Sequence, residues 1–272
     1  MSFILTNTDT MLNNGSTPPL KFIVMNLVAL FLGACTFAQM QGGASYLPVP
    51  DLSAATYTLA VHEVNFEGVS NLGKQRLTYD QVKGSPFFND DFQQAEIFMA
   101  DGRSLGRYMV KFNLLTQEFH FLGKDKAEMV VPNDLARKIV VYDKSDTSLQ
   151  RAVFVRTLDF TSPSGKPLGE YAEQLNVGNA ILYKVEKKNV VTADSLFGTL
   201  KRYYFGTTYA YFIGINGRVN QLKKLSEDAV FTALPAVGKL EEWARKNKIN
   251  LKREEGVLAL MQQWNASFNN KR

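Results

Sequence analysis

Apolar and polar side chains alternate through the middle of the chain, in short runs that end at turn-forming residues. In residues 107–113 every second side chain is apolar, namely Tyr108, Val110 and Phe112. The dipeptide Asp101-Gly102 precedes this run and is typical of a tight hairpin turn. Alternation of period two between such turns predicts antiparallel strands with one face in a core. The other face, which carries Lys111 and Asn113, is expected in water.

Runs with the same character occur on both sides of this segment. They cover residues 57–63, 93–99, 118–121, 138–142, 151–158, 180–185, 201–205 and 209–215. Asn216-Gly217 follows the last run and is the preferred dipeptide of a type I′ hairpin turn. Residues 218–222 are therefore expected to return as the second strand of that hairpin.

The pattern changes to helical spacing after Lys223. Ser226 is a suitable N-cap for a short helix that Pro235 would end, and residues 239–246 are expected to form a second helix. A third helix is expected near the C-terminus, because one stripe there is apolar at positions i, i+3, i+4, i+7 and i+11: Val257, Leu260, Met261, Trp264 and Phe268. Helices this short need a partner surface to be stable.

These patterns predict an α+β protein. Residues 39–222 are expected to form an antiparallel β-rich domain of hairpins, and the helices of residues 223–272 are expected to pack on it as a C-terminal cap. The chain has 272 residues, of which 45% are hydrophobic and 21% are charged, which is ordinary for a globular protein.

A secretory signal peptide is expected at the N-terminus. Lys21 precedes the mostly apolar residues 22–34, and small residues follow them, which is the pattern of an export signal. The apolar run is shorter than the roughly 20 residues that a membrane-spanning helix needs. No transmembrane span is therefore expected in the mature chain.

Two processing sites compete in this segment. Cleavage after Ala38 would remove residues 1–38 and leave a free chain. Alternatively, residues 32–35, with the sequence Leu-Gly-Ala-Cys, resemble a bacterial lipobox, in which Cys35 would carry a lipid anchor and become the new N-terminus. Either route exports the protein to the periplasm, the cell surface or the medium. Cys35 is the chain's single cysteine, so no disulfide and no thiolate site is expected in the mature domain.

The charge of the chain argues against nucleic acid as a partner. The formal net charge is +5, but the basic residues are spread along the sequence, and blocks such as Lys187-Lys188 and Lys223-Lys224 are only pairs. Nucleic-acid binding needs a concentrated basic patch. We expect a mildly cationic, solvated surface.

Few residues are candidates for chemistry. Neither His62 nor His120 has a second histidine at a metal-binding spacing such as HExxH, and both are expected on exposed faces of strands. Asp90 and Asp91 belong to the densest acidic cluster, which does not have the ligand spacing of a calcium loop. Phosphate-binding glycine motifs and a GxSxG nucleophile elbow are absent from the sequence. We expect no metal and no cofactor, and the sequence identifies no catalytic residue.

Several stretches resemble a family of exported, uncharacterised proteins of Bacteroidetes-type bacteria. The stretches that carry the resemblance are Gly-Ser-Pro-Phe-Phe-Asn-Asp-Asp-Phe at residues 84–92, Asp101-Gly102, residues 107–112, residues 246–252 and Gln-Trp-Asn at residues 263–265. The resemblance implies an exported β-rich domain with a helical tail, and it implies no particular activity.

Three functions follow from these observations as hypotheses. The first is a non-enzymatic binding or structural protein of the bacterial envelope with an unknown ligand. The second is a periplasmic or extracellular hydrolase that uses Asp90, Asp91 or His120 in a cleft. The third is an assembly partner that offers an exposed strand edge. Carboxylates that converge in a concave pocket would favour the hydrolase.

The processing of the N-terminus can be tested directly. We expect the protein from its native host to lack residues 1–38, or to lack residues 1–34 and to carry lipid on Cys35. Intact-mass spectrometry distinguishes the two, and Cys35→Ser should change the mass only if the lipid is attached there. An unprocessed chain in the cytoplasm would contradict export.

Overall fold

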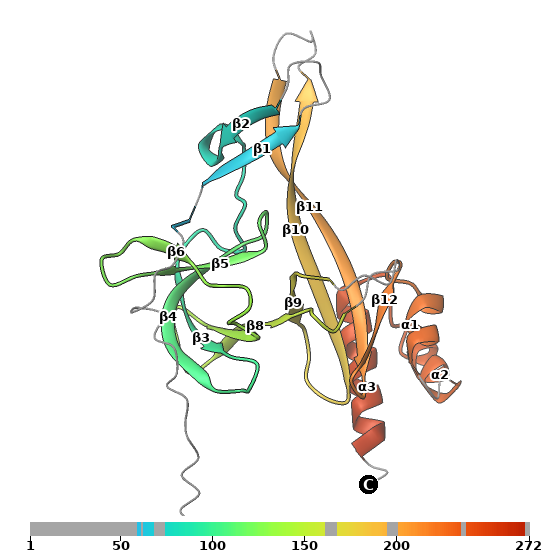
Figure 1. The fold of residues 1–272 in the computed structure, drawn as a ribbon. Coiled ribbons are helices and arrows are strands. Elements are labelled where there is room, and N and C mark those ends of the chain that lie inside the picture. Colours follow the sequence, from blue (N-terminus) through green and yellow to red (C-terminus); the bar gives the residue numbers. More distant parts are fainter. Residues whose placement is uncertain are drawn as a thin grey trace, which may run out of the picture. The chain divides into compact units, whose positions relative to one another are not determined.

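The computed structural model describes residues 59–60, 62–67, 74–160, 168–194, 201–234 and 238–269, all of which belong to one compact unit, Tyr46–Arg272. The expected signal peptide, residues 1–38, lies outside the described residues. The fold is α+β, as predicted: an antiparallel sheet of ten strands is followed by three helices that pack on it (Figure 1).

The strands and helices have the following bounds. A small two-stranded sheet consists of β1 (Glu63–Glu67) and β2 (Lys74–Thr78). The large sheet consists of β3 (Gln93–Phe98), β4 (Ser104–Asn113), β5 (Glu118–Leu122), β6 (Glu128–Val130), β7 (Lys138–Tyr142), β8 (Gln150–Arg156), β9 (Tyr171–Gln174), β10 (Ala180–Asp194), β11 (Lys201–Ile215) and β12 (Arg218–Leu222). The helices are α1 (Glu227–Ala233), α2 (Gly238–Lys246) and α3 (Glu254–Asn269).

The large sheet is formed mainly by neighbours in sequence. Its strand order is β12-β11-β10-β9-β8-β7-β3-β4-β5-β6, and β3 departs from a simple meander by lying between β7 and β4. Its edge strands, β6 and β12, span three and five residues. The assembly hypothesis required a long unpaired edge. These two strands are short, but residues 201–210 of β11 extend beyond β12, and in the described chain the bridge between Lys83 and Tyr204 lies in this part.

The longest strands differ from the expectation. The sequence indicated three short strands at residues 180–185, 201–205 and 209–215, but β10 and β11 each run for 15 residues and pair without interruption from Ala180↔Ile215 to Asp194↔Lys201. Gly206 lowers the local strand propensity, but it pairs with Asn189 and keeps the register. Pairing along the hairpin therefore outweighs the weak local signal.

The strand expected over residues 57–63 is described only in part, because residues 57, 58 and 61 lie outside the described residues. Among the others, Leu59 forms an isolated bridge with Met129 of β6, and β1 begins at Glu63. The backbone N–H of Ala60 donates to the carbonyl of Glu128, 3.0 Å away. This segment therefore lies along the edge of the large sheet before it turns into β1.

The outer half of the β10–β11 hairpin is held by loops from elsewhere in the chain. The N–H of Lys83 donates to the carbonyl of Tyr203 at 2.9 Å. On the other strand, the N–H of Lys188 donates to the carbonyl of Leu114 at 3.0 Å, and the Gln117 side chain donates to the carbonyl of Glu186 at 2.8 Å. These bonds satisfy backbone groups that lie beyond the reach of β9 and β12.

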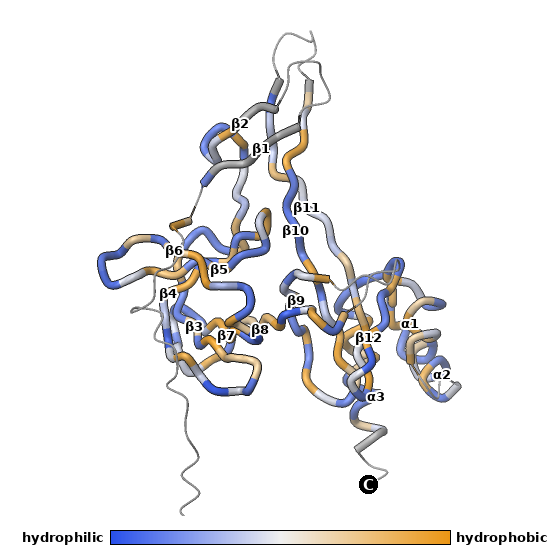
Figure 2. The backbone as a smooth tube through the Cα atoms, viewed as in Figure 1, coloured by the Kyte–Doolittle hydropathy of each residue, from blue (hydrophilic) through white to orange (hydrophobic). Residues whose placement is uncertain are grey.

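Two main hydrophobic clusters stabilise the fold, and Figure 2 shows the apolar segments of each. One fills the β3–β9 part of the sheet with aromatic side chains, including Phe112, Phe119 and Phe154. The other joins the inner ends of β10, β11 and β12 to the three helices. Among the described residues, no helix has the length and apolar character that crossing a membrane requires.

The turn and capping predictions are confirmed. Asn216 and Gly217 have φ values of 49° and 80°, so both have the positive φ that a type I′ turn requires. The side chain of Ser226 accepts a hydrogen bond from the N–H of Ala229 and caps α1. Helix α1 ends at Ala233, shortly before Pro235.

Helix α3 is fastened to β10 by its apolar stripe and by one amide. Val257, Leu260 and Met261 are fully buried in the helix-side cluster. The N–H of Ala180 donates to Oδ1 of Asn265 at 2.8 Å, and Nδ2 of Asn265 donates to the carbonyl of Ala180 at 2.9 Å. The helical cap is thus an integral part of the fold.

The packing of α3 predicts a large cost for truncating Trp264, which is only 5% exposed. Trp264→Ala should lower the free energy of unfolding by about 3–5 kcal/mol, because it leaves a cavity in the helix-side cluster. Urea denaturation, monitored by circular dichroism, measures the free energy of unfolding. Ser267→Ala, at an exposed position of the same helix, is the control and should change this free energy by less than about 1 kcal/mol. Equal stability of the two variants would show that α3 docks only weakly.

Candidate functional site

A row of ionisable side chains crosses three strands of the large sheet. Lys111 of β4 lies directly opposite His120 of β5, so both side chains are on the same face. Glu128 of β6 pairs with Leu122, two residues beyond His120, and therefore lies on that face as well. Strand register alone brings these three groups together.

A segment from before the large sheet covers this row. The ring of Phe87 meets the ring of His120 edge-on at 5.8 Å, and Tyr79 stacks on His62 at 5.6 Å. The Lys111 ammonium lies 4.0 Å from the centre of the Phe87 ring, which is a cation–π contact. The aromatic cover removes much of the row from water.

The aromatic cover buries a face of the sheet that was expected to be exposed to solvent. His120 is 1% exposed and Asn113 is fully buried, whereas both were predicted to face solvent. The Lys111 side chain is only 9% exposed. The physical reason is the bridge between Phe87 and Asn113, which closes the segment over β4, together with the hydrogen bond from Asn113 Nδ2 to the Tyr79 hydroxyl at 2.9 Å.

Three nitrogens converge on one carboxylate oxygen, Oε1 of Glu128. His120 Nδ1 lies 2.6 Å from it, His62 Nε2 lies 3.2 Å from it, and Lys111 Nζ lies 3.4 Å from it. The coordinating atoms of the two histidines and the glutamate all lie within 4.8 Å of one another. We call His62, His120 and Glu128 the histidine cluster.

Burial and pairing set the protonation of the histidine cluster. Burial lowers the pKa of His120, and this outweighs the hydrogen bond to Glu128 that acts in the opposite direction. For Glu128, burial alone would raise the pKa, but the bond from His120 and the charge of Lys111 together lower it. A neutral His120 that donates from Nδ1 to an ionised Glu128 satisfies both groups.

The lowered pKa of His120 links stability to pH in a definite direction. The unfolded chain binds a proton at this imidazole more readily than the folded chain does, because burial holds the pKa of His120 below the usual imidazole value of about 6.5. The contribution of His120 to stability is therefore fully present above that usual value and is lost as the pH falls toward and through the lower pKa of the folded state.

The aspartates proposed from the sequence do not join the histidine cluster. Asp90 accepts a hydrogen bond from the hydroxyl of Ser85, and Asp91 forms an exposed ion pair with Lys144 at 2.9 Å. In the described part of the chain, no interaction connects either aspartate with His120. Glu128 was missed because its strand has three residues and no alternation, and only the pairing of β5 with β6 reveals it.

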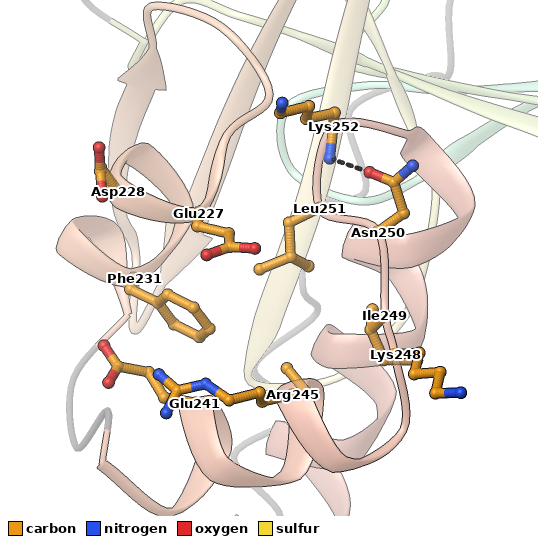
Figure 3. A pocket seen from close by; sticks show the side chains of 11 residues that line it. Glu227, Asp228, Phe231, Glu241, Arg245, Lys248, Ile249, Asn250, Leu251 and Lys252 are labelled. Atoms are coloured by element: carbon orange, nitrogen blue, oxygen red, sulfur yellow. Dashed lines mark hydrogen bonds between the residues drawn. The ribbon is translucent and has the colours of Figure 1, made fainter.

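A concave feature lies among the C-terminal helices, and we call it the helical cleft. It has a volume of about 680 Å³ and is bounded by α1, α2 and the loop that leads to α3. Figure 3 shows Phe231 of α1 beside Glu241 and Arg245 of α2, while Glu227 of α1 points toward Leu251 of the loop. Acidic, basic and apolar side chains thus meet in one space.

Comparisons with family models, with curated proteins and with solved structures found no match to this chain. The geometry of the helical cleft and of the histidine cluster therefore carries the functional argument.

The two histidines should differ in their effect on stability. His120→Ala should cost about 1.5–3 kcal/mol, because it removes a buried hydrogen bond to a charged carboxylate. His62→Ala is the matched control and should cost less than about 1 kcal/mol, because the His62 side chain is 45% exposed. Urea denaturation at pH 7.5 with EDTA measures both. If the two variants were equally stable, His120 would not have the structural role described here.

Proposed function

We propose that the protein is an exported, non-enzymatic binding protein that holds a short peptide in the helical cleft. The observation that carries the proposal is the cleft itself, whose volume of about 680 Å³ is within the range of small-ligand sites.

The lining of the helical cleft matches a ligand with both charges and an apolar part. Its acidic residues are Glu227, Asp228 and Glu241, and its basic residues are Arg245, Lys248 and Lys252. Phe231, Ile249 and Leu251 provide apolar surface. A peptide with free termini carries an ammonium group, a carboxylate and side chains that can occupy these regions. Charges of both signs orient such a ligand and favour it over one that carries a single charge.

The positions of the three residues that were candidates for hydrolysis favour binding as the function. Hydrolysis by Asp90, Asp91 or His120 would require these groups to converge in a concave site. Instead, His120 is buried against Glu128, while Asp90 and Asp91 have other partners, Ser85 and Lys144.

The proposed export of the protein is based on features of its amino-acid sequence. The signal-like residues 22–34 and the alternative lipid site at Cys35 support a location outside the cytoplasm, either free or anchored. The resemblance to exported β-rich proteins supports the same location. Short peptides are available as ligands in such a compartment, which is consistent with a cleft that is open to solvent.

The binding proposal can be tested with a panel of unblocked tripeptides that have an apolar central residue. We expect one or more of them to raise the melting temperature of the protein, because a ligand that binds only the folded state stabilises it. The same peptides with an acetylated N-terminus and an amidated C-terminus should have much less effect. Differential scanning fluorimetry and isothermal titration calorimetry measure the effect.

Charge reversals at the rim of the helical cleft provide the controls. Glu227→Lys and Arg245→Glu should each weaken peptide binding by about tenfold or more, through the loss of one charge contact and the gain of a repulsion. Glu255→Lys and Lys246→Glu are matched changes outside the cleft lining and should leave binding intact. The proposal fails if no peptide binds or if the rim variants bind normally. Cleaved peptide in the incubations, detected by mass spectrometry, would instead favour the hydrolase.

A further inference from the structure

The geometry of the histidine cluster points to a binding site for a divalent transition-metal ion, and we propose Zn²⁺ as its ligand. His62, His120 and Glu128 contribute two imidazole nitrogens and one carboxylate, which is a ligand set of known zinc sites. The proposal is independent of the helical cleft, because the two features are formed by different residues.

The spacing of the ligand atoms is near the zinc value for His62 and Glu128, whereas His120 and Glu128 lie closer together than two zinc ligands do. Ligands at about 2.0–2.2 Å from a tetrahedral ion lie about 3.3–3.6 Å from one another. Oε1 of Glu128 lies 3.2 Å from His62 Nε2 and 2.6 Å from His120 Nδ1. Small rotations of the side chains would open the cluster enough to admit an ion, with no change in strand pairing.

The backbone holds all three ligands in place. His120 and Glu128 lie on the paired strands β5 and β6. The third ligand, His62, follows a segment that the N–H of Ala60 ties to the carbonyl of Glu128 at 3.0 Å. The carbonyl of His62 itself accepts from the N–H of Tyr79 at 3.2 Å. Ligands positioned before the ion arrives lose less conformational entropy on binding.

The cluster combines a closed side with an open side. His120 is 1% exposed beneath Phe87, whereas the side chain of His62 is 45% exposed. An ion could therefore enter beside His62, and a water molecule could complete its coordination there. Three protein ligands with one open position distinguish reactive or exchangeable zinc sites from closed structural ones.

Lys111 is the competitor that any metal ion must displace. Its ammonium lies 3.4 Å from Oε1 of Glu128 and supplies the positive charge that a zinc ion would otherwise provide. A divalent ion bound to the cluster would be repelled by this charge at short range. Metal affinity should therefore be limited by Lys111, and removing its charge should increase the affinity.

The test is a Zn²⁺ titration of the full chain, monitored by calorimetry at pH 7.5. Bound metal is first removed with EDTA, and the EDTA is then removed. All proteins carry Cys35→Ser, so that this thiol does not contribute. We expect one ion per chain and a higher melting temperature with zinc. His62→Gln should bind at least about 100-fold more weakly, because the loss of even an outer-shell partner costs about 10–100-fold in affinity.

The test uses a substitution at His62 and not at His120, so that loss of zinc binding is not confused with loss of the fold. His62 is exposed, so His62→Gln is expected to fold, whereas His120→Gln could lose stability. Lys111→Met should bind zinc more tightly, on the order of tenfold, since it removes one positive charge near the ion. Asp91→Asn removes a carboxylate outside the cluster and should bind like the parent protein.

The outcomes separate a metal site from a structural cluster. Stoichiometric binding that is lost in His62→Gln and enhanced in Lys111→Met supports the site. Substitution with Co²⁺ should then give the visible absorption of a tetrahedral ion, and His62→Gln should lack it. Absence of stoichiometric binding, or equal binding by His62→Gln, overturns the proposal and leaves the cluster as a hydrogen-bonded part of the fold.

Discussion

The pairing of β10 with β11 is the constraint on which the remaining structure depends. Over 15 residues these two strands satisfy one another's backbone, but each also has an outer edge that must be satisfied. The inner part of the hairpin is flanked by β9 and β12, and it presents the apolar face on which the helices pack. The outer part is flanked by Lys83 and Leu114, which come from loops near β4. The need to cover this hairpin thus explains why the loop before β3 lies where it does.

That loop also creates the buried polar row. Once residue 83 is attached to β11, the chain between Tyr79 and Phe87 passes over the polar face of β4 and β5, and the aromatic rings displace water from it. A lysine, a histidine and a glutamate are costly to bury separately, because each loses its hydration. Together they share one carboxylate oxygen, so the burial of each is offset by the others.

The features that could be predicted from the sequence are those that depend on near neighbours. The alternation around Val110, the Asn216-Gly217 turn, the Ser226 cap and the apolar stripe through Leu260 each involve residues a few positions apart, and the structure confirms them. His120 lies on the polar face that was predicted, but its exposure was predicted wrongly, because the residues that cover it lie more than 30 positions earlier. Glu128 was missed for the same reason, since its role depends on the register between strands and not on spacing along the chain.

The charge balance of the histidine cluster decides between its two roles. A structural cluster is complete as it stands, because Lys111 neutralises Glu128 and His120 donates to it. Zinc binding has to be more favourable than this arrangement. It would form three coordinate bonds, but it would break the hydrogen bond from His120 to Glu128, whose Nδ1 proton must move to Nε2 or to solvent, and it would remove the attraction between Lys111 and Glu128. The lysine that stabilises the metal-free fold therefore also sets the affinity threshold that a metal ion must exceed.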